Sequence, residues 1–496
     1  MDILNAPYAR DFTPTKSLHF GTLVGQSARA LRLIFVTFLL VAAGAEAAPL
    51  TLEQLIERAR THDYRVKEAQ AQLRFYRAQY DQARWAWFPR MDSYIGVGGP
   101  TQEARNNGIG GPPTTPSGYL YDTDFGQPGV QFQAGADATL PIYTFGKLDA
   151  LEEAGKQGVN AGEALAVTAR DESEYQMSQA YYGYCLAKSA LLVVDDLAKR
   201  LDDSEKVLKR LREEGSEQVT QMDIFKLGFY RQQAEAQRAQ AENGARLALA
   251  AIRLLIAAAP DEQIEVQFVE LKAPEGELRP SDQYVIDGAE NRPELRAIAA
   301  GLLASEQEVK IREAMFYPDF GIVGSFRWKW TTNSTRQVSP WAYDPYNELN
   351  ATIGLGMRYS WDFPVKSIML EQARAKFEKT QHQKDLIGAG VKLEIEKAWG
   401  EADLAMKRSA RQTEAEINAR RWANAAYTAF DLGTGDTREL VDAFSAFAQA
   451  SASRAQAFHD AQVALRALNR AVGKHVTLNT KPEAVTPPPP TNLQPK

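Results

Sequence analysis

Residues 351–362 read ATIGLGMRYSWD, and apolar and polar side chains alternate along the whole stretch. Residues 130–140, which read VQFQAGADATL, repeat this pattern. Residues 319–328 follow it with one exception, Val323, and residues 91–97 follow it less regularly. Because successive side chains of a strand point to opposite sides of a sheet, the sequence predicts four strands, each with one apolar and one polar face.

The length of these strands and the aromatic residues at their ends favour a membrane barrel. Strands of about 9–11 residues span a bilayer when their apolar face meets lipid and their polar face meets water. Aromatic residues bracket the strands, as in interfacial girdles: Trp87, Phe88, Tyr317, Trp361 and Phe363 at one end, and Trp328, Trp330, Trp341 and Tyr343 at the other. The alternative is an ordinary sheet packed on a soluble core, which is the commoner outcome for any single strand. Four such strands in one exported chain favour the barrel.

Four strands are too few to close a barrel by themselves. The two open edges would leave unpaired backbone groups in lipid, each costing several kcal/mol. We therefore expect the chain to oligomerise. Two copies would give eight strands around a filled interior, and three would give twelve strands and room for a lumen. The polar faces would line this lumen with charges of both signs from Asp137, Arg327 and Arg358.

The chain also carries an internal duplication. Three pairs of markers lie at nearly constant offsets of 229, 223 and 218 residues: Pro89 and Pro318, Pro141 and Pro364, and Gly215 and Gly433. Each copy contains two strands and long helical segments, so the order of elements is the same in both halves.

Apolar residues at helical spacing predict six helices: residues 52–84, 148–214, 223–258, 293–314, 368–430 and 438–472. Two of them are about 65 residues long, which corresponds to roughly 100 Å at 1.5 Å per residue. Apolar residues step by four and three along residues 180–201 and 440–468, although Ser451 and Arg454 interrupt the second series. This spacing predicts coiled-coil packing between neighbouring helices.

The two ends of the chain read as segments outside the fold. Arg29 and Arg32 precede an apolar run, and Ala45-Glu46-Ala47 fits a signal-peptidase site. The expected organisation is a signal peptide over residues 1–47, a first repeat over 48–280, a second repeat over 281–480 and a Pro-rich disordered tail over 481–496.

Composition and motifs argue against several classes of function. The net charge is −6 and the 57 basic residues are dispersed, so no basic stripe for nucleic acid is present. No histidine lies at metal-ligand spacing from another or from the single cysteine, Cys185, and no Gly-rich nucleotide loop occurs. We expect neither a catalytic activity nor a metal or cofactor.

The chain resembles the TolC-like outer-membrane efflux proteins, also called outer membrane factors, over about residues 50–474. Five segments carry the resemblance: Leu50-Thr51-Leu52-Glu53-Gln54, Phe88-Pro89, Leu140-Pro141-Ile142-Tyr143, Gly433-Thr434 and Leu440-Val441-Asp442-Ala443. It implies a mixed α and β fold, in which an oligomeric outer-membrane β-barrel with four strands per chain continues into a long periplasmic α-helical coiled-coil barrel. It also implies a homotrimer in the outer membrane of a Gram-negative bacterium, a periplasmic adaptor protein and an inner-membrane transporter.

The resemblance further implies where the periplasmic end closes and where the adaptor binds. Family members close this end with carboxylates just past the second helical tip, which correspond here to Glu439 and Asp442, with Asp223 near the first tip as a weaker candidate. Gly215, Gly433 and Thr434 mark the tips that would contact the adaptor. A solvated helix face near a turn is the alternative explanation of the carboxylates.

The expected function is the outer-membrane exit duct of a tripartite efflux or type I secretion system. The alternative is a periplasmic coiled-coil adaptor or scaffold without a pore. In adaptors, however, a helical hairpin lies inside a β-rich domain, whereas here two hairpins interrupt pairs of strands. The sequence leaves open whether the cargo is a drug, a metal ion or a protein.

Overall fold

The structure is a computed structural model that describes residues 49–101, 129–213, 220–332, 334, 346–432 and 434–478. The predicted signal peptide and the predicted tail lie outside these ranges. The chain divides into two units. In the smaller one, a parallel bridge joins Leu50 to Val266: Leu50 N–H donates to the Glu265 carbonyl at 2.8 Å, and Gln267 N–H donates to the Leu50 carbonyl at 3.0 Å.

The larger unit contains one four-stranded antiparallel sheet in the order β1-β2-β3-β4. The strands are β1 (Arg90–Thr101), β2 (Gly129–Tyr143), β3 (Asp319–Thr331) and β4 (Glu348–Arg358). All four predicted strands are therefore present. The fourth begins three residues and ends four residues earlier than the predicted stretch 351–362, so Trp361 lies beyond it.

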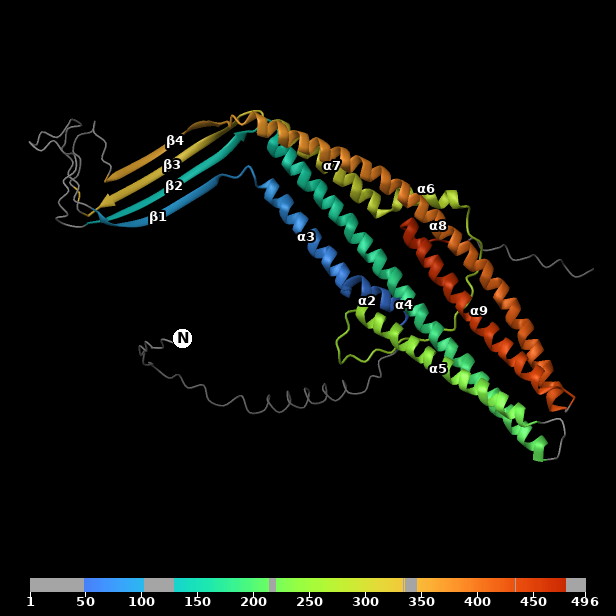
Figure 1. Ribbon diagram of the computed structural model, residues 1–496. Helices are drawn as coiled ribbons and strands as arrows, with labels where there is room; N and C mark the ends of the chain where they lie inside the picture. The colour runs from blue at the N-terminus through green and yellow to red at the C-terminus, as the bar shows by residue number, and fades with distance from the viewer. Residues whose placement is uncertain are drawn as a thin grey trace, which may run out of the picture. The chain divides into compact units, whose positions relative to one another are not determined.

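Eight helices are described in this unit: α2 (Leu52–His62), α3 (Tyr64–Arg84), α4 (Lys147–Glu213), α5 (Gln221–Leu255), α6 (Ser281–Asn291), α7 (Pro293–Ala314), α8 (Phe363–Asp431) and α9 (Thr437–Val472). With 67 and 69 residues, α4 and α8 are the two long helices that the sequence predicts. Each pairs with the helix that follows it, which produces the hairpins α4/α5 and α8/α9 (Figure 1). Within the described ranges no helix is both long and apolar enough to cross a bilayer.

Two predictions about the helices are wrong. The segment from residue 52 to 84 is not one helix, because Asp63 leaves the helical conformation and its side chain accepts a hydrogen bond from Arg65 N–H to begin α3. The short helix α6 was also missed. Both errors concern the same feature of the repeat, a short helix that ends just before a longer one. In the first repeat α2 and α3 meet at Asp63, and in the second α6 and α7 meet at Arg292, 229 residues later. The duplication therefore includes a short helix before each strand-leading helix.

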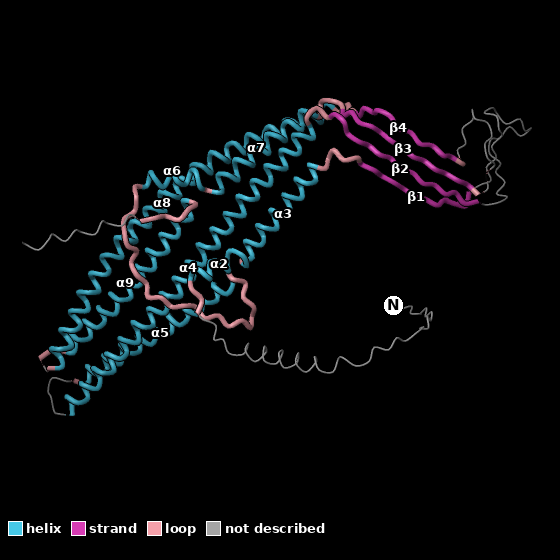
Figure 2. The backbone as a smooth tube through the Cα atoms, turned by 180° about the vertical axis from the view of Figure 1, so that it is seen from behind, coloured by secondary structure: helices cyan, strands magenta, loops and turns pink. Residues whose placement is uncertain are grey.

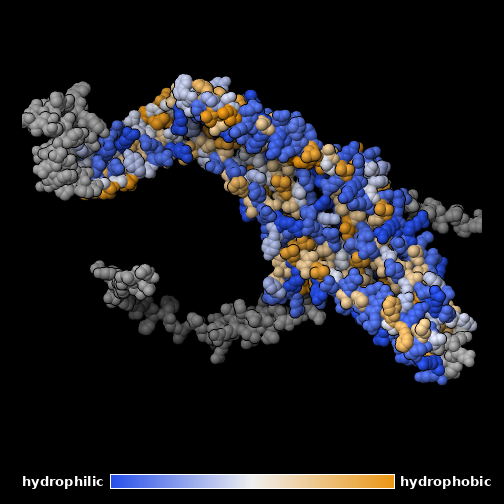
Figure 3. Space-filling view, in the orientation of Figure 1, coloured by the Kyte–Doolittle hydropathy of each residue, from blue (hydrophilic) through white to orange (hydrophobic). Residues whose placement is uncertain are grey.

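The helices pack along the predicted seams. In α4, Ala187, Val194 and Leu201 are buried, and in α9 Leu440 and Phe444 are buried. Near the tips, residues of α4, α5, α8 and α9 form one apolar cluster, and a second cluster joins α6, α8 and α9. Figure 3 shows hydrophilic and hydrophobic residues interspersed over the visible face of the helices.

Candidate functional site: a two-faced sheet and two helical hairpins

The register of the sheet places its polar residues on a single face, because directly opposite residues of paired strands point to the same side. Asp137 lies opposite Asp92 and Ser325. Arg327 lies opposite Gly135 and Asn350, and Arg358 lies opposite Asp319. All three predicted lumen-facing residues therefore share one face of the sheet.

The other face is apolar and uncovered. Ile95, Ile353 and Leu355 lie on it and are 88%, 80% and 85% exposed. In Figures 1 and 2, which view the chain from opposite sides, no described helix lies over either face of the sheet. This sheet does not pack on the helices of its own chain, so another apolar phase must meet these side chains.

Glycines on the polar face make room for larger side chains of the neighbouring strand. The ring of Tyr94 lies over Gly135, where an added Cβ would come within 2.4 Å of ring carbon Cε1. Val323 lies over Gly356 in the same way, with its Cγ2 at 2.6 Å from the position of an added Cβ. Glycine is required at these two positions by close approach rather than by backbone conformation.

Aromatic rings gather where the sheet joins the helices. Phe145 stacks on Tyr317 with ring centroids 4.7 Å apart, and Trp361 meets Tyr359 at 5.0 Å. Lys366, whose side chain is only 3% exposed, lies 4.2 Å from the centroid of the Tyr359 ring and donates to the Ser360 carbonyl at 2.5 Å. Such amphipathic rings suit the boundary between lipid and water.

Strands β1 and β4 are the two edges of the sheet. Each is hydrogen-bonded to one neighbouring strand within the described part of the chain. The remaining backbone groups of these edges need a partner if the apolar face lies in lipid.

The structure brings Glu439 and Asp442 together on the first turns of α9, where both are exposed. Glu439 accepts a hydrogen bond from Nε1 of Trp422 on α8 at 3.1 Å. Asp442 forms an ion pair with Arg438 at 3.8 Å, which partly offsets its charge. Glu439 thus joins the two helices of the second hairpin, a contact that the sequence does not reveal.

Of the other four residues predicted at the tips, the structure describes Asp223 and Thr434. Asp223 lies on the first hairpin and accepts from Thr220 N–H at 2.9 Å and Thr220 Oγ1 at 2.7 Å, so its carboxylate caps α5. Thr434 donates to the Ala429 carbonyl from its N–H at 3.0 Å and from its hydroxyl at 3.1 Å, and so closes the end of α8. Gly215 and Gly433 lie outside the described residues.

A charge cluster around the buried Arg292, which the sequence does not predict, joins four helices. The side chain of Arg292 is 7% exposed and binds Glu394 at 2.5 Å, Glu294 at 3.1 Å and the Arg470 carbonyl at 2.9 Å. Arg470 in turn binds Glu394 at 2.7 Å and Glu172 at 2.5 Å. Because these residues are up to 298 positions apart, no local pattern could have indicated the cluster.

Next to this cluster, burial and then the charges of Glu174 and Glu294 raise the pKa of Asp171 to about 6, against the lowering effect of Arg60 and Arg292. A carboxyl whose folded pKa is raised destabilises the fold once it is ionised. The penalty is absent below about pH 4, grows as the pH rises, and is complete above about pH 6.

We therefore expect Asp171→Asn to stabilise the protein at pH 7.5 by about 1 kcal/mol per chain, after allowance for solvent at this half-buried position. The gain should disappear near pH 4. Thermal unfolding in detergent at both pH values measures the difference. An equal gain at both pH values would contradict the assignment of the effect to ionisation.

The family of outer membrane efflux proteins matches residues 55–258 and 287–474. The chain belongs to this family. The two matched segments correspond to the two structural repeats and include α3 to α5 and α7 to α9 with all four strands. Members of this family are outer-membrane channels, so membership places the chain in the outer membrane of a Gram-negative bacterium, with its helices extending into the periplasm.

Solved structures of outer-membrane channels share this fold. VceC of Vibrio cholerae is 17% identical, with 85% of this chain and 96% of VceC covered at a TM-score of 0.68. The open-state channel MtrE of Neisseria gonorrhoeae is 17% identical, with 87% and 91% covered at a TM-score of 0.66. The channel OprN is 19% identical, with 85% and 89% covered at a TM-score of 0.68. No curated protein sequence matches the chain significantly.

In this efflux protein the strands and the helices form separate parts of the larger unit. The two-faced sheet provides the membrane part, and the hairpins α4/α5 and α8/α9 provide the periplasmic part. The predicted fold class, including the internal duplication, is confirmed by the family match and the shared fold. The roles of individual tip and lumen residues stay predictions.

Proposed function

We propose that three copies of this efflux protein close a twelve-stranded barrel and form the exit duct of a tripartite efflux or type I secretion system. The uncovered apolar face of the sheet, with its two edge strands, carries this proposal. Neither edge is completed within one chain, and identical copies supply matching edges in a closed ring. Cargo passes along the polar face, which includes Asp137, Arg327 and Arg358.

The duct has no catalytic role in this proposal. Energy comes from an inner-membrane transporter, and a periplasmic adaptor holds the tips of the hairpins around residues 215 and 433. Thr434 belongs to the second tip. The alternative of a periplasmic scaffold without a pore lacks a physical reason for the exposed Ile95, Ile353 and Leu355.

Disulfide trapping between β1 and β4 tests the closed ring. On a Cys185→Ala background, Ile95→Cys is combined in turn with Ile353→Cys, Leu355→Cys and Met357→Cys, and membranes are oxidised. We expect one pairing to give covalent dimers and trimers on denaturing gels, and no larger species.

In the matched control, Ile95 is left unchanged and Ala134→Cys takes its place in each pair. Ala134 lies on the inner strand β2 and faces the same side as Leu355. Because β2 is paired on both sides, its cysteine cannot reach β4 of another copy. Trapping in the control, or a ladder beyond three chains, would argue against a closed trimer.

The second proposal is that Glu439 and Asp442 restrict the periplasmic end. In a three-fold assembly each position repeats as a ring of carboxylates, and Glu439 also holds α9 to Trp422 of α8. We expect Glu439→Ala with Asp442→Ala to raise cation conductance in planar bilayers, because the α8–α9 contact that restricts this end is lost. We also expect lower selectivity for cations, because the carboxylate rings that attract cations are lost.

The control for this experiment is Glu396→Ala with Glu401→Ala, which removes two exposed carboxylates of α8 farther from the tip. Its conductance should equal that of the unmodified protein. Unchanged conductance and ion selectivity in the tip variant would remove the gating role while leaving the barrel intact.

A further inference from the structure

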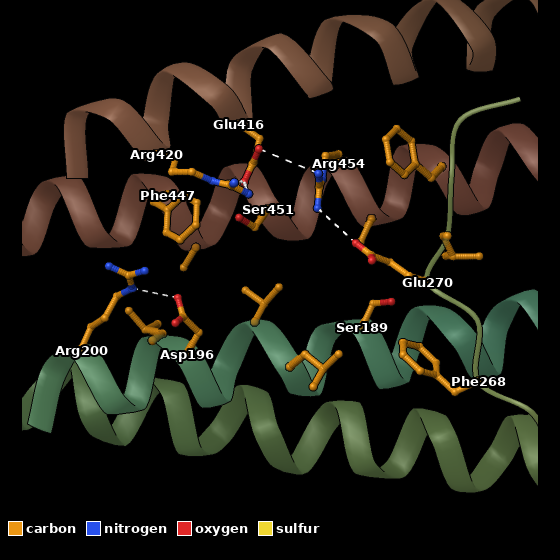
Figure 4. Close-up of a pocket in the computed structure, with 17 residues that line it drawn as sticks. Ser189, Asp196, Arg200, Phe268, Glu270, Glu416, Arg420, Phe447, Ser451 and Arg454 are labelled. Atoms are coloured by element: carbon orange, nitrogen blue, oxygen red, sulfur yellow. Dashed lines mark hydrogen bonds and ion pairs between the residues drawn. The ribbon is translucent and has the colours of Figure 1, made fainter. Parts of the chain in front are cut away.

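A cavity of about 240 Å³ lies between the two helical hairpins of the chain (Figure 4). Residues of α4 form one wall, residues of α8 and α9 form the opposite wall, and residues 268–271 of the connector close one end. The cavity is well above the tips and lies on neither face of the sheet. Neither the proposed barrel nor the proposed gate uses it.

Two buried serine hydroxyls at this cavity lack hydrogen-bond partners. Ser451 of α9 is 6% exposed, and its Oγ has no partner in the described part of the chain. Ser189 of α4, on the opposite wall, likewise has an unpartnered Oγ. Serine in a helix usually satisfies its hydroxyl with a carbonyl of the preceding turn. Of the five other buried serines in the described helices, Ser178, Ser204, Ser305 and Ser409 do so, and Ser173 does not.

Arg454 supplies a third incompletely used donor group. Its guanidinium lies 3.9 Å from Glu270 and 3.9 Å from Glu416, which is too far for hydrogen bonds, and its Nε is buried without a partner. The other two arginines at the cavity are satisfied: Arg420 binds Glu416 at 2.6 Å and Arg200 binds Asp196 at 2.8 Å. Figure 4 shows the Arg454 side chain at the α9 wall between Glu416 and Glu270.

The rest of the wall is apolar. Phe268, Phe447 and Phe458 line the cavity together with leucine and valine side chains of α4. The cavity therefore combines two unpartnered hydroxyls and an arginine with an unpartnered Nε with a largely hydrophobic lining, the combination that small-molecule sites show. An inorganic anion would leave the phenylalanines without an apolar partner, and a neutral apolar molecule would leave the donors unpaired.

We propose that this cavity binds a small organic carboxylate with an apolar body. Its carboxylate accepts from Arg454 and from the hydroxyls of Ser189 and Ser451, and its body packs against the phenylalanines. A planar guanidinium pairs with a carboxylate more strongly than with a neutral acceptor. Because Ser189 belongs to the first hairpin and Arg454 to the second, a bound molecule also links the two hairpins.

Benzoate is a suitable probe, since it combines one carboxylate with one ring. Isothermal titration of the full mature protein in detergent is expected to show one benzoate bound per chain. Benzyl alcohol has the same ring without the charge and reports partition into the detergent. We expect benzoate to bind at least tenfold more tightly than benzyl alcohol, in line with a charge-assisted hydrogen bond.

Three variants and a control locate the binding. Arg454→Met keeps the approximate length of the side chain but removes its charge. It should weaken benzoate binding about ten- to a hundredfold, because the charge-assisted hydrogen bonds are lost. Ala455→Leu fills the cavity and should abolish binding, whereas Ala452→Leu, on the exposed side of the same helix, should leave it unchanged. Ser451→Ala removes an unpartnered hydroxyl, so it should fold normally and weaken binding severalfold.

The proposal is overturned if benzoate fails to bind at millimolar concentration, or if it binds no better than benzyl alcohol. It is also overturned if Ser451→Ala and Ala455→Leu both bind benzoate as the unmodified protein does. The cavity is formed within one chain, so the result of the benzoate experiment does not depend on whether the chain forms a trimer.

Discussion

Ile353→Arg is expected to prevent stable insertion of the protein into the outer membrane. Ile353 is the central residue of β4, points to the apolar face and is 80% exposed. Arginine on the lipid side of a barrel at the middle of the bilayer costs about 2–4 kcal/mol. In the proposed trimer the substitution occurs three times, so the total cost is roughly 6–12 kcal/mol. This is comparable to the whole stability of a typical domain.

The neighbouring residue provides the control. Thr352 lies on the same strand but on the polar face, opposite Ser325. Thr352→Arg should insert normally, because its side chain meets water rather than lipid. Membrane fractionation and the heat-sensitive oligomer on unheated denaturing gels measure both variants. Equal insertion of the two would show that the apolar face does not meet lipid.

Arg292→Met is expected to destabilise the periplasmic helices strongly. Arg292 is buried and holds Glu394 and Glu294 at the junction of α6 and α7. Removing its charge leaves Glu294 without its cation and leaves Glu394 paired with Arg470 alone, next to an apolar side chain in the buried position of Arg292. Breaking one partner of a buried pair costs about 3–5 kcal/mol.

An exposed arginine gives the comparison. Arg77 binds Glu163 at 2.8 Å, but both side chains are more than half exposed. Arg77→Met should therefore cost less than about 1 kcal/mol. Thermal unfolding followed by circular dichroism at helical wavelengths separates the two variants. A similar loss in both would mean that burial does not set the strength of the Arg292 cluster.

The strands and the long helices were predictable because each has a period that sequence reveals directly. Alternation in residues 351–362 identified the two faces of β4, and the register of the sheet confirms that its neighbours share those faces. The start and end of α7 at residues 293 and 314 were also predicted correctly, because Pro293 begins the helix and its last turn precedes Pro318. Boundaries elsewhere moved by a few residues.

The features that were missed depend on contacts between distant residues. The break at Asp63 has no proline or glycine to mark it, and its cap is a hydrogen bond within an otherwise helical pattern. The Arg292 cluster brings together residues from α4, α8 and α9 that no spacing connects. At the tip, the sequence indicated two carboxylates at positions 439 and 442, but the hydrogen bond from Trp422 to Glu439 could be seen only in the fold.

The two open edges of the sheet have a genetic consequence. A subunit whose edge strand cannot pair prevents closure of any trimer that contains it. In the proposed trimer such an allele is therefore dominant-negative over the wild-type allele. With equal expression and random mixing, only about one ring in eight contains three intact subunits. Strains that carry both alleles should therefore lose far more than half of their export.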